Sequence, residues 1–436
     1  MPVSCRIVIL LMGFAKAFWI LARVSMTQSD RGTSRGTSLA GVKVLDLSRV
    51  LAAPLAAQIL GDLGAEVVKI ERPALGDDSR NIGGVALPGP DGPTSERSFY
   101  LSCNRNKQSL TLDLANPAAQ AVLKRLAASA DVLIENYKVG TLAKYGLDYD
   151  SLAAVNPRLI YCSVTGYGQD GPRAPEPGYD PVFQAESGLM SITGFPDREP
   201  VKAGTYLVDI LGGHNAAIGI LAALHDRETT GLGQHLDIAL FDCALASLAT
   251  VGQTYLVSGQ VPGRQGNGPL SGGPSDVFNC ADGAVYIIAG LDRQFEKLCA
   301  VLKLEHLPKD PKFAKTALRY TNRAELREIL QEAIFGWECA SLLVELAKVT
   351  VPAGRVNTVA DALSDEQAEF RQMVLPMAHP LSDNLKVLAS PIRLSRTPPV
   401  YDLPPPLLGE HSESVLNRWL GMSPSEVGVL REQGAL

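Results

Sequence analysis

The sequence predicts an α/β protein with a large domain on a mainly parallel, Rossmann-like sheet and a smaller α/β domain after it. One observation is that short apolar strand-like runs alternate with helical segments from residue 39 to residue 257. Another is the length of 436 residues, which exceeds what one hydrophobic core usually fills. Strands that alternate with helices form parallel sheets covered on both faces, and ligands bind beyond the carboxyl ends of such strands.

The first three elements predict a βαβ unit. The run VKVLDL at residues 42–47 predicts a strand, and residues 52–63 have helical spacing with Pro54 in the first turn. Gly64 is placed to end this helix, and EVVKI at residues 66–70 predicts the next strand. Two strands joined by a helix in this way lie parallel in one sheet.

The alternation continues along the chain until the composition changes at residue 258. Further strands are predicted at residues 109–112, 132–134, 159–164 and 235–240, and helices at 117–128, 180–189, 208–227 and 241–257, with helical turns near Leu142 and Leu152. Residues 258–275 are rich in Gly and Pro, which indicates a domain boundary or an active-site loop.

Elements beyond this stretch predict a smaller α/β unit and a C-terminal segment. They are a strand at 285–289, helices at 295–302 and 326–333, and short helices at 414–420 and 424–433 after the prolines at 404–406. We therefore divide the chain into a leader and linker (1–37), a large domain (38–257), a small domain (258–345) and a C-terminal segment that returns to the large domain (346–436).

The composition excludes several classes of function. The 40 Lys and Arg residues face 46 Asp and Glu residues, a formal charge of −6, whereas nucleic-acid-binding proteins normally have a basic excess. The seven Cys residues are far apart and form no CxxC pair, which favours buried thiols in a reducing compartment over disulfides. The six His residues lack the spacing of metal ligands, so no metal is expected.

Residues 1–37 differ in composition from the rest of the chain. Five basic residues oppose a single acid, Asp30, and Lys16 interrupts the apolar run, which argues against a membrane-spanning helix. Two interpretations stay open: a mitochondrial transit peptide, or a true start at Met26. We expect a cytoplasmic protein, or a mitochondrial matrix protein if residues 1–37 are a genuine transit peptide.

Residues 166–171 (GYGQDG) match the GxGxxG pattern of dinucleotide-binding proteins and follow a predicted strand. That fingerprint must open a helix, because the helix N-terminus holds the pyrophosphate. Here Pro172, Pro175 and Pro177 favour an extended loop instead. The sequence therefore argues against a nicotinamide or flavin enzyme.

Three aspartates beside apolar segments are candidates for chemistry. Asp209 lies in YLVDILGG, a junction in which an acid would be partly desolvated and the paired glycines would admit a substrate. The alternative, for Asp209 and for Asp180 at the start of another helix, is an acid that satisfies free N–H groups of a helix N-terminus. Asp46 lies between apolar strand residues and is expected to be structural.

Basic residues are concentrated before residue 108. A solvated face and a phosphate-binding rim are both compatible with this clustering. The residues are Arg49, Lys69, Arg72, Arg80, Arg105 and Lys107.

Ordered motifs along the chain resemble those of class III CoA-transferases. The motifs are LAGVKVLDLSRVLAAPLAAQILGDLGAEVVKIERPALGDDSR at 39–80, NRNK at 104–107, IENY at 134–137, GYG at 166–168, GYD at 178–180, the surroundings of Asp209, and PLLGEH at 406–411. The resemblance covers residues 39–436. It implies a ring-like subunit that interlocks with a second one as a homodimer, with coenzyme A thioesters as substrates and no permanently bound cofactor.

By this resemblance Asp209 falls on the family's nucleophilic aspartate. Its carboxylate would attack the thioester to give an aspartyl–acyl anhydride and then an aspartyl–CoA thioester. Backbone N–H groups beside glycines would stabilise the oxyanions, and Gly266 and Gly268 are candidates.

The same resemblance places contacts with CoA on the large domain. Val50 and Leu51 lie in the first strand-to-helix turn, and Arg72 is expected near the adenosine phosphate. Arg72, Lys138 and Lys144 supply fixed cations that suit phosphates. The further expected contacts are Leu112, Asp113, Asn136, Tyr137, Lys138, Lys144, Tyr179 and Asp180.

Two departures from the family pattern bear on function. Tyr179 stands where the related racemases carry a His before the Asp, and a racemase needs a second proton-transfer group there, so Tyr179 favours transfer. The loop at residues 266–270 reads GNGPL, whereas many relatives have a His in it, which leaves its role in substrate choice open.

The densest resemblance is to succinyl-CoA:glutarate-type transferases. We therefore expect the chain to move CoA from an acyl-CoA, succinyl-CoA first, to a small dicarboxylic acid such as glutarate, whose far carboxylate a basic group would hold. Two alternatives stay open: a 2-methylacyl-CoA racemase of the same superfamily, and a non-catalytic CoA-binding protein. Neither nucleic acid nor membrane is an expected partner.

Overall fold

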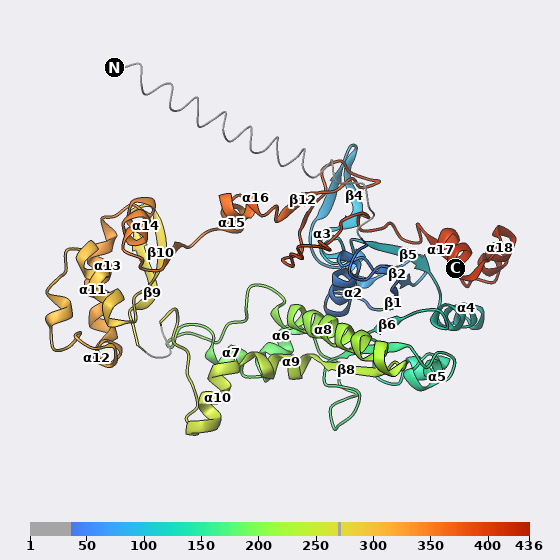
Figure 1. The fold of residues 1–436 in the computed structure, drawn as a ribbon, viewed down its shortest axis with the longest axis horizontal. Helices are drawn as coiled ribbons and strands as arrows, with labels where there is room; N and C mark the ends of the chain where they lie inside the picture. Colours follow the sequence, from blue (N-terminus) through green and yellow to red (C-terminus); the bar gives the residue numbers. More distant parts are fainter. Residues whose placement is uncertain (1–35, 269–271) are drawn as a thin grey trace, which may run out of the picture.

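A six-stranded parallel sheet with the order β5–β2–β1–β6–β7–β8 forms the centre of the molecule (Figure 1). The structure is a computed structural model that describes residues 36–268 and 272–436, and the predictions for residues 1–35 lie outside these ranges. The predicted parallel sheet is confirmed, and its strand order reverses between β1 and β6. The strands are β1 (Lys43–Asp46), β2 (Glu66–Glu71), β5 (Lys107–Thr111), β6 (Val132–Glu135), β7 (Ile160–Thr165) and β8 (His235–Ala239).

The central strands are buried on both faces, which explains why their sequences are continuous apolar runs. All four residues of β6 and all six of β7 are buried. Val44 of β1 pairs with Val67 of β2 on one side and with Val132 of β6 on the other. Such runs without alternation are typical of a parallel sheet between two helical layers.

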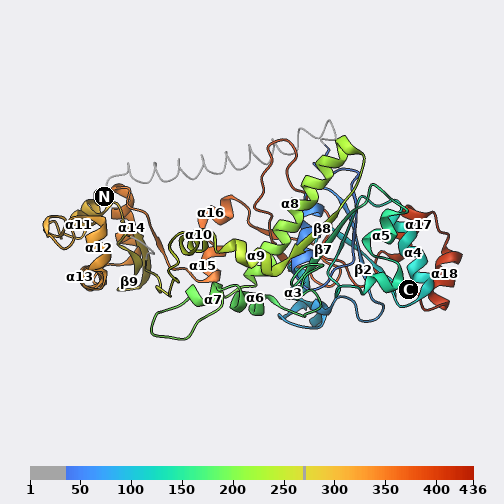
Figure 2. The same ribbon diagram turned by 90° about the horizontal axis from the view of Figure 1, so that it is seen from below.

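Helices cover both faces of this sheet, as Figure 2 shows with α8 on one side of the strands and α4, α5 and α17 on the other. Each layer is one hydrophobic core. One layer consists of α4 (Pro117–Ala127), α5 (Tyr149–Ala153), α17 (Ser412–Leu420) and α18 (Pro424–Glu432). The other consists of α2 (Ala52–Asp62), α6 (Asp180–Glu186), α8 (Leu207–Thr230) and α9 (Leu240–Ser247).

Helix α8 packs closely on α2 through paired glycines. A Cβ atom on Gly213 would lie 2.6 Å from the backbone oxygen of Ala52 and 3.1 Å from the Cβ of Leu55, and one on Gly212 would collide with Leu240. The expectation that Gly212 and Gly213 admit a substrate is therefore wrong, because both glycines are used for helix packing. Helix α8 is long and apolar enough to cross a membrane, and 44% of its most apolar 18-residue stretch is buried inside the protein.

A second unit has its own core at one end of the molecule (Figure 1). Its three-stranded antiparallel sheet has the order β11–β10–β9. The predicted domain limits at residues 38, 258 and 346 stay predictions. The elements are β9 (Ser275–Cys280), β10 (Gly283–Ile288), β11 (Ala353–Arg355), α11 (Asp292–Val301), α12 (Thr316–Thr321), α13 (Arg323–Phe335) and α14 (Cys339–Lys348).

Residues 356–436 run back along the central sheet. The backbone N–H of Asn106 donates to Leu403 O at 2.9 Å, and that of Asp113 donates to Ala435 O at 3.0 Å. Small elements on this path, and others within residues 86–101, were not predicted, and several of the two groups share one core. They are β3 (Ala86–Gly89), β4 (Gly92–Arg97), α3 (Ser98–Leu101), α15 (Val359–Leu363), α16 (Glu366–Phe370), β12 (Val374–Pro376) and β13 (Lys386–Leu388).

Two predicted helices are each divided in the structure. The helix expected at 241–257 is α9 followed by α10 (Ala249–Ser258), bent by 73° at Ala249, whose φ is +42°. The helix expected at 180–189 is α6 followed by α7 (Leu189–Ile192), with Gly188 at a φ of +91° between them. A left-handed residue ends the regular hydrogen bonding of a helix, so the chain changes direction at both points.

Candidate active site

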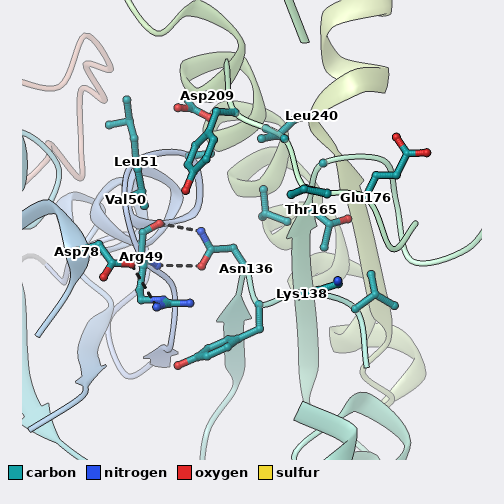
Figure 3. Close-up of a pocket in the computed structure, with 18 of the residues that line it drawn as sticks. Arg49, Val50, Leu51, Asp78, Asn136, Lys138, Thr165, Glu176, Asp209 and Leu240 are labelled. Atoms are coloured by element: carbon teal, nitrogen blue, oxygen red, sulfur yellow. Dashed lines mark hydrogen bonds and ion pairs between the residues drawn. The ribbon is translucent and has the colours of Figure 1, made fainter. Parts of the chain in front are cut away.

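The site lies at the carboxyl ends of β1 and β6, where the strand order reverses. A cavity of ≈ 290 Å³ opens there, and open parallel sheets place ligands at this topological position. The turn after β1 contributes Arg49, Val50 and Leu51, and the loop after β6 contributes Asn136 and Lys138 (Figure 3).

Asp209 projects into this cavity from the first turn of α8. In Figure 3 it lies beside Leu240, at the opposite end of the cavity from Lys138. Tyr179, which precedes α6, lines the same cavity. The structure thus brings Asp209 and Tyr179, both predicted as site residues, to the same cavity.

The Asp209 carboxyl is desolvated, and no cation or donor in the described part of the chain compensates for this. Burial raises its pKa to about 7, and the negative charge of Asp180 adds to the rise. Among the described residues the Asp209 carboxylate accepts no hydrogen bond. A partly buried carboxyl with a raised pKa inside a cavity is typical of a catalytic group.

Asp180 lies behind Asp209, with both carboxylate oxygens occupied. Its Oδ1 accepts the backbone N–H groups of Val208 at 2.6 Å and of Asp209 at 3.2 Å, and its Oδ2 accepts from Gln184 Nε2 at 2.5 Å. Asp180 therefore caps α8 from a neighbouring helix and satisfies two of its free N–H groups. The acid that satisfies a helix N-terminus is thus Asp180, which leaves the Asp209 carboxyl free.

A second cavity of ≈ 240 Å³ adjoins the first, and Arg49 and Tyr137 line both. The predicted CoA contacts divide between the two cavities, except for Lys144 and the buried Asp180. Lys144 is exposed on the turn η2 (Leu142–Tyr145) and lines neither. The first cavity collects Val50, Leu51, Asn136, Tyr137, Lys138 and Tyr179, and the second collects Arg72, Leu112, Asp113 and Tyr137.

Most of the clustered basic residues are buried. Lys69 and Lys107 are fully buried, and Lys107 Nζ lies 2.8 Å from Asp46 Oδ2. Arg80 and Arg105 are also buried, in ion pairs with acidic residues. Neither a solvated face nor a phosphate rim describes these four residues, and the structural role expected for Asp46 is confirmed. Arg49 and Arg72 alone of the six line the two cavities.

The glycine amides proposed for the oxyanions are occupied within this chain. Gly266 N–H donates to Gly194 O at 2.9 Å, and Gly268 N–H donates to Gln265 O at 3.1 Å. Gly268 lines a different cavity of ≈ 420 Å³, beside the second unit. The expectation that these two N–H groups are available to stabilise an oxyanion is therefore wrong.

Arg49, expected among the clustered basic residues, lines this cavity, whereas Thr165 and Glu176 were missed in the sequence. Arg49 lies 4.9 Å from the ring centroid of Tyr137, and its Nη1 is 3.2 Å from Asp78 Oδ2. Thr165 ends β7 at the same edge of the sheet, and Glu176 lies in the loop that follows it. The predicted parallel order would have found Thr165, because carboxyl ends of neighbouring strands share one edge.

The cavity combines an unpaired carboxyl with cations at a distance from it. In residues 36–268 and 272–436 no group of three or more His, Cys, Asp or Glu side chains is placed to hold a metal ion. The six cysteines in these ranges are free and buried. The arrangement suits a carboxylate nucleophile at one end of a substrate whose other end carries negative charge.

Comparisons with known proteins agree with this chemistry. The model of CoA-transferase family III matches residues 39–412. The chain is 40% identical over 383 residues to the succinate–glutarate CoA-transferase of Agrobacterium fabrum, covering 88% of this chain and 96% of that protein. It is 38% identical over 410 residues to the human succinyl-CoA:glutarate CoA-transferase, with 94% and 92% covered. The crystal structure of a CaiB/BaiF family protein from Brucella suis superposes with a TM-score of 0.80 at 43% identity, covering 88% and 100%.

Proposed function

Because the chain belongs to CoA-transferase family III, we propose that it transfers coenzyme A from succinyl-CoA to glutarate or a closely related dicarboxylate. The family assignment makes the chain a transferase that moves CoA between an acyl-CoA and a carboxylic acid. The similarity to glutarate-named relatives over nearly their full length supports the choice of acids. The observation that carries the mechanism is the unpaired carboxyl of Asp209 in the cavity.

The first half-reaction transfers CoA to the enzyme. The Asp209 carboxylate attacks the thioester carbonyl of succinyl-CoA, and CoA thiolate leaves as an aspartyl–succinyl anhydride forms. The thiolate then attacks the aspartyl carbonyl, which releases succinate and leaves an aspartyl–CoA thioester. A carboxylate that is poorly solvated attacks more readily because less water must leave it.

The second half-reaction runs the same steps with the acceptor. A glutarate carboxylate attacks the aspartyl–CoA carbonyl, giving an aspartyl–glutaryl anhydride and CoA thiolate. The thiolate attacks the glutaryl carbonyl, which forms glutaryl-CoA and restores the Asp209 carboxylate. No redox change and no net proton transfer occur, so the two substrates and two products balance.

The two cavities fit the two ends of an acyl-CoA. The second cavity offers Arg72, and Arg49 stands where the two cavities meet, so the phosphates would lie over these cations. The pantetheine arm would then cross Tyr137 into the first cavity, which brings the thioester to Asp209.

We also propose that the chain acts as an interlocked homodimer of ring-like subunits. Helix α10 has no buried residue, although it is largely apolar. Leu256, Val257 and Val261 are 75%, 79% and 81% exposed, and several large apolar side chains exposed close together in the sequence are typical of an interface. Analytical ultracentrifugation tests whether the protein is a dimer. Val257→Glu should weaken the dimer, whereas Glu228→Gln at an exposed position of α8 should not.

For the cell compartment we propose the cytoplasm, or the mitochondrial matrix if residues 1–37 act as a transit peptide. An import assay with isolated mitochondria separates the two. Import that requires residues 1–25 supports the matrix, and a chain that starts at Met26 and remains outside supports the cytoplasm.

The deciding experiment is a chromatographic assay of the purified protein with succinyl-CoA and glutarate. Wild type should form glutaryl-CoA, Asp209→Ala should not, and Asp226→Ala at the far end of α8 should behave as wild type. Exchange that survives Asp209→Ala would contradict the mechanism. No exchange with glutarate, oxalate, itaconate, citramalate or carnitine would contradict the acceptor, and epimerisation of a 2-methylacyl-CoA would then support a racemase. CoA binding without any new thioester would support a non-catalytic binding protein.

A further inference from the structure

The turn between β1 and α2 has an unfavourable backbone conformation. Val50 has a φ of +74°, in the left-handed region, and it is β-branched. Such a residue is rarely found there because its side chain crowds the backbone, and the conformation persists only when the surroundings impose it. Val50 lines the cavity, so the strain is located at the site itself.

One side chain holds the residue before Val50 at both of its backbone polar groups. Asn136 Oδ1 accepts the backbone N–H of Arg49 at 2.9 Å, and Asn136 Nδ2 donates to the backbone oxygen of Arg49 at 2.7 Å (Figure 3). Asn136 directly follows β6, so this pair of bonds joins the turn to the neighbouring strand. Among the described residues, the Asn136 side-chain amide forms hydrogen bonds with Arg49 alone.

A second side chain holds Val50 itself. Asp77 Oδ1 accepts the backbone N–H of Val50 at 3.0 Å and the N–H and hydroxyl of Ser79 at 2.9 and 2.7 Å. Its Oδ2 lies 2.8 Å from the Nζ of Lys69, which also donates to the backbone oxygen of Ser48 at 2.8 Å. Both Asp77 and Lys69 are buried, so this ion pair is not screened by solvent.

The charge of Asp77 is stable over the working range of pH. Burial opposes its ionisation, but the ammonium of Lys69 and the N–H groups of Ser79 and Val50 outweigh that effect and lower the pKa to about 2. The acceptor of the Val50 N–H is therefore a fixed anion, which makes a stronger hydrogen bond than a neutral group.

The turn lines the cavities and is connected through α2 to the helix that carries the nucleophile. Arg49 lines both cavities, and α2 begins directly after Leu51. Helix α2 in turn packs against Gly213 in the second turn of α8, the helix that carries Asp209. A relaxed turn would thus move the wall on which an acyl-CoA lies relative to Asp209.

We propose that Asn136 and Asp77 are positioning residues that hold residues 48–51 in the strained conformation that binds acyl-CoA. This inference rests on the proposed function, in which the two cavities take the acyl-CoA. It gives Asn136 a role different from that of a direct CoA ligand. We call the hydrogen bonds of Asn136 and Asp77 to this turn the clamp. When the clamp is lost, the turn relaxes toward negative φ, and the fraction of protein that can bind acyl-CoA falls. The apparent dissociation constant for acyl-CoA rises in inverse proportion to that fraction, while kcat at saturation changes much less.

The direct test is Asn136→Asp, which keeps an acceptor for the Arg49 N–H but replaces the donor to the Arg49 oxygen by a repelling oxygen. We expect the KM for succinyl-CoA and the calorimetric Kd for CoA to rise about tenfold, with kcat within about twofold of wild type. Asn156→Asp is the matched control, because Asn156 also joins backbone groups, donating to Ala127 O and Ala130 O away from the site. It should leave KM and Kd unchanged. If Asn136→Asp does not fold, Asn136→Ala removes both bonds without adding a charge.

The second test asks whether the clamp acts on the strain. Glycine adopts a φ of +74° freely, so in a Val50→Gly background the turn no longer needs holding. Asn136→Asp should then raise KM and Kd about threefold or less, measured against Val50→Gly alone. An equal effect in both backgrounds would overturn the proposal, as would a loss of kcat with unchanged KM. Wild type that neither transfers nor binds CoA would instead overturn the proposed function, and the clamp with it.

Discussion

Asp180 accepts the backbone N–H of Asp209 at 3.2 Å, so the residue that fixes the candidate nucleophile also repels its charge. The hydrogen bonds that Asp180 accepts from Val208 and Asp209 set the direction of the first turn of α8. Its negative charge, together with burial, keeps the Asp209 carboxyl partly protonated at neutral pH. Position and ionisation of Asp209 are thus coupled through one buried side chain.

The rate of transfer should therefore depend on pH through Asp209. Because only the carboxylate attacks a thioester, kcat/KM for succinyl-CoA should rise with pH and level off above about 7. Asp180→Asn keeps both acceptor bonds to α8 and removes the charge, so the pKa of Asp209 should fall and the rise should shift to lower pH. A pH profile of the two proteins checks this, with Asp226→Asn as the control on the same helix. An unshifted profile would show that Asp180 does not tune the nucleophile.

Removal of the Asp209 charge should stabilise the fold at high pH. The pKa of Asp209 is about 7 in the folded chain against 3.8 as the ordinary value. Its contribution to stability is therefore fully present below about 3.8 and is lost as pH rises through about 7. Asp209→Asn does not titrate, so its gain in Tm over wild type should be larger at pH 8 than at pH 5. Equal gains at both pH values would contradict the raised pKa, and Asp226→Asn should show no such difference.

Two cations expected to bind CoA should differ in effect. Arg72 lines the second cavity, whereas the exposed Lys144 lines neither cavity. A charge-assisted bond to a phosphate is worth about 1.5–3 kcal/mol, so Arg72→Ala should raise the KM for succinyl-CoA about tenfold or more at low salt. Lys144→Ala should change it less than about twofold. Steady-state kinetics at two salt concentrations measure the KM of both variants. Equal effects of the two substitutions on KM would show that the phosphates lie elsewhere.

Gly213→Ala should destabilise the protein, because its Cβ would meet the Ala52 oxygen at 2.6 Å and backbone cannot yield as a side chain end does. Overpacking of this kind costs about 1–3 kcal/mol in unfolding free energy. Gly428→Ala in α18 is the matched control, since nothing lies within 4 Å of its Cβ. There the substitution should be neutral or stabilising by up to about 1 kcal/mol. Denaturant unfolding of both variants tests the difference.

The sequence predicted the sheet because short, largely apolar strands alternate with helical segments. Residues 160–165 and 132–135 are buried on both faces, and such runs are recognisable without the structure. The edge on which the site lies followed from the same pattern. Asp209 was found by its apolar surroundings and by resemblance, and it lies in the cavity that the topology predicts.

Features that depend on distant contacts were not predictable in the same way. Lys69 and Lys107 are buried only because Asp46 and Asp77 meet them from other strands and loops. The β3–β4 hairpin contains Pro88 and Pro93, which favour a loop, and it forms a core with residues 377–387. The strain at Val50 has no local signal either, because Asp77 is 27 positions from Val50 and Asn136 is 87 positions from Arg49.

The return of the C-terminal segment has a consequence for how the protein is made. The second unit, residues 275–355, encloses its own core, but the layer over β2 and β5 includes Val415, Leu416 and Trp419. Asn106 binds the backbone of Val400, 294 residues later in the chain. During translation this apolar face of the sheet therefore stays open until α17 has left the ribosome, while the second unit can already close. The nascent chain carries an unfinished large core through most of its synthesis, which favours slow, late folding and engagement by chaperones.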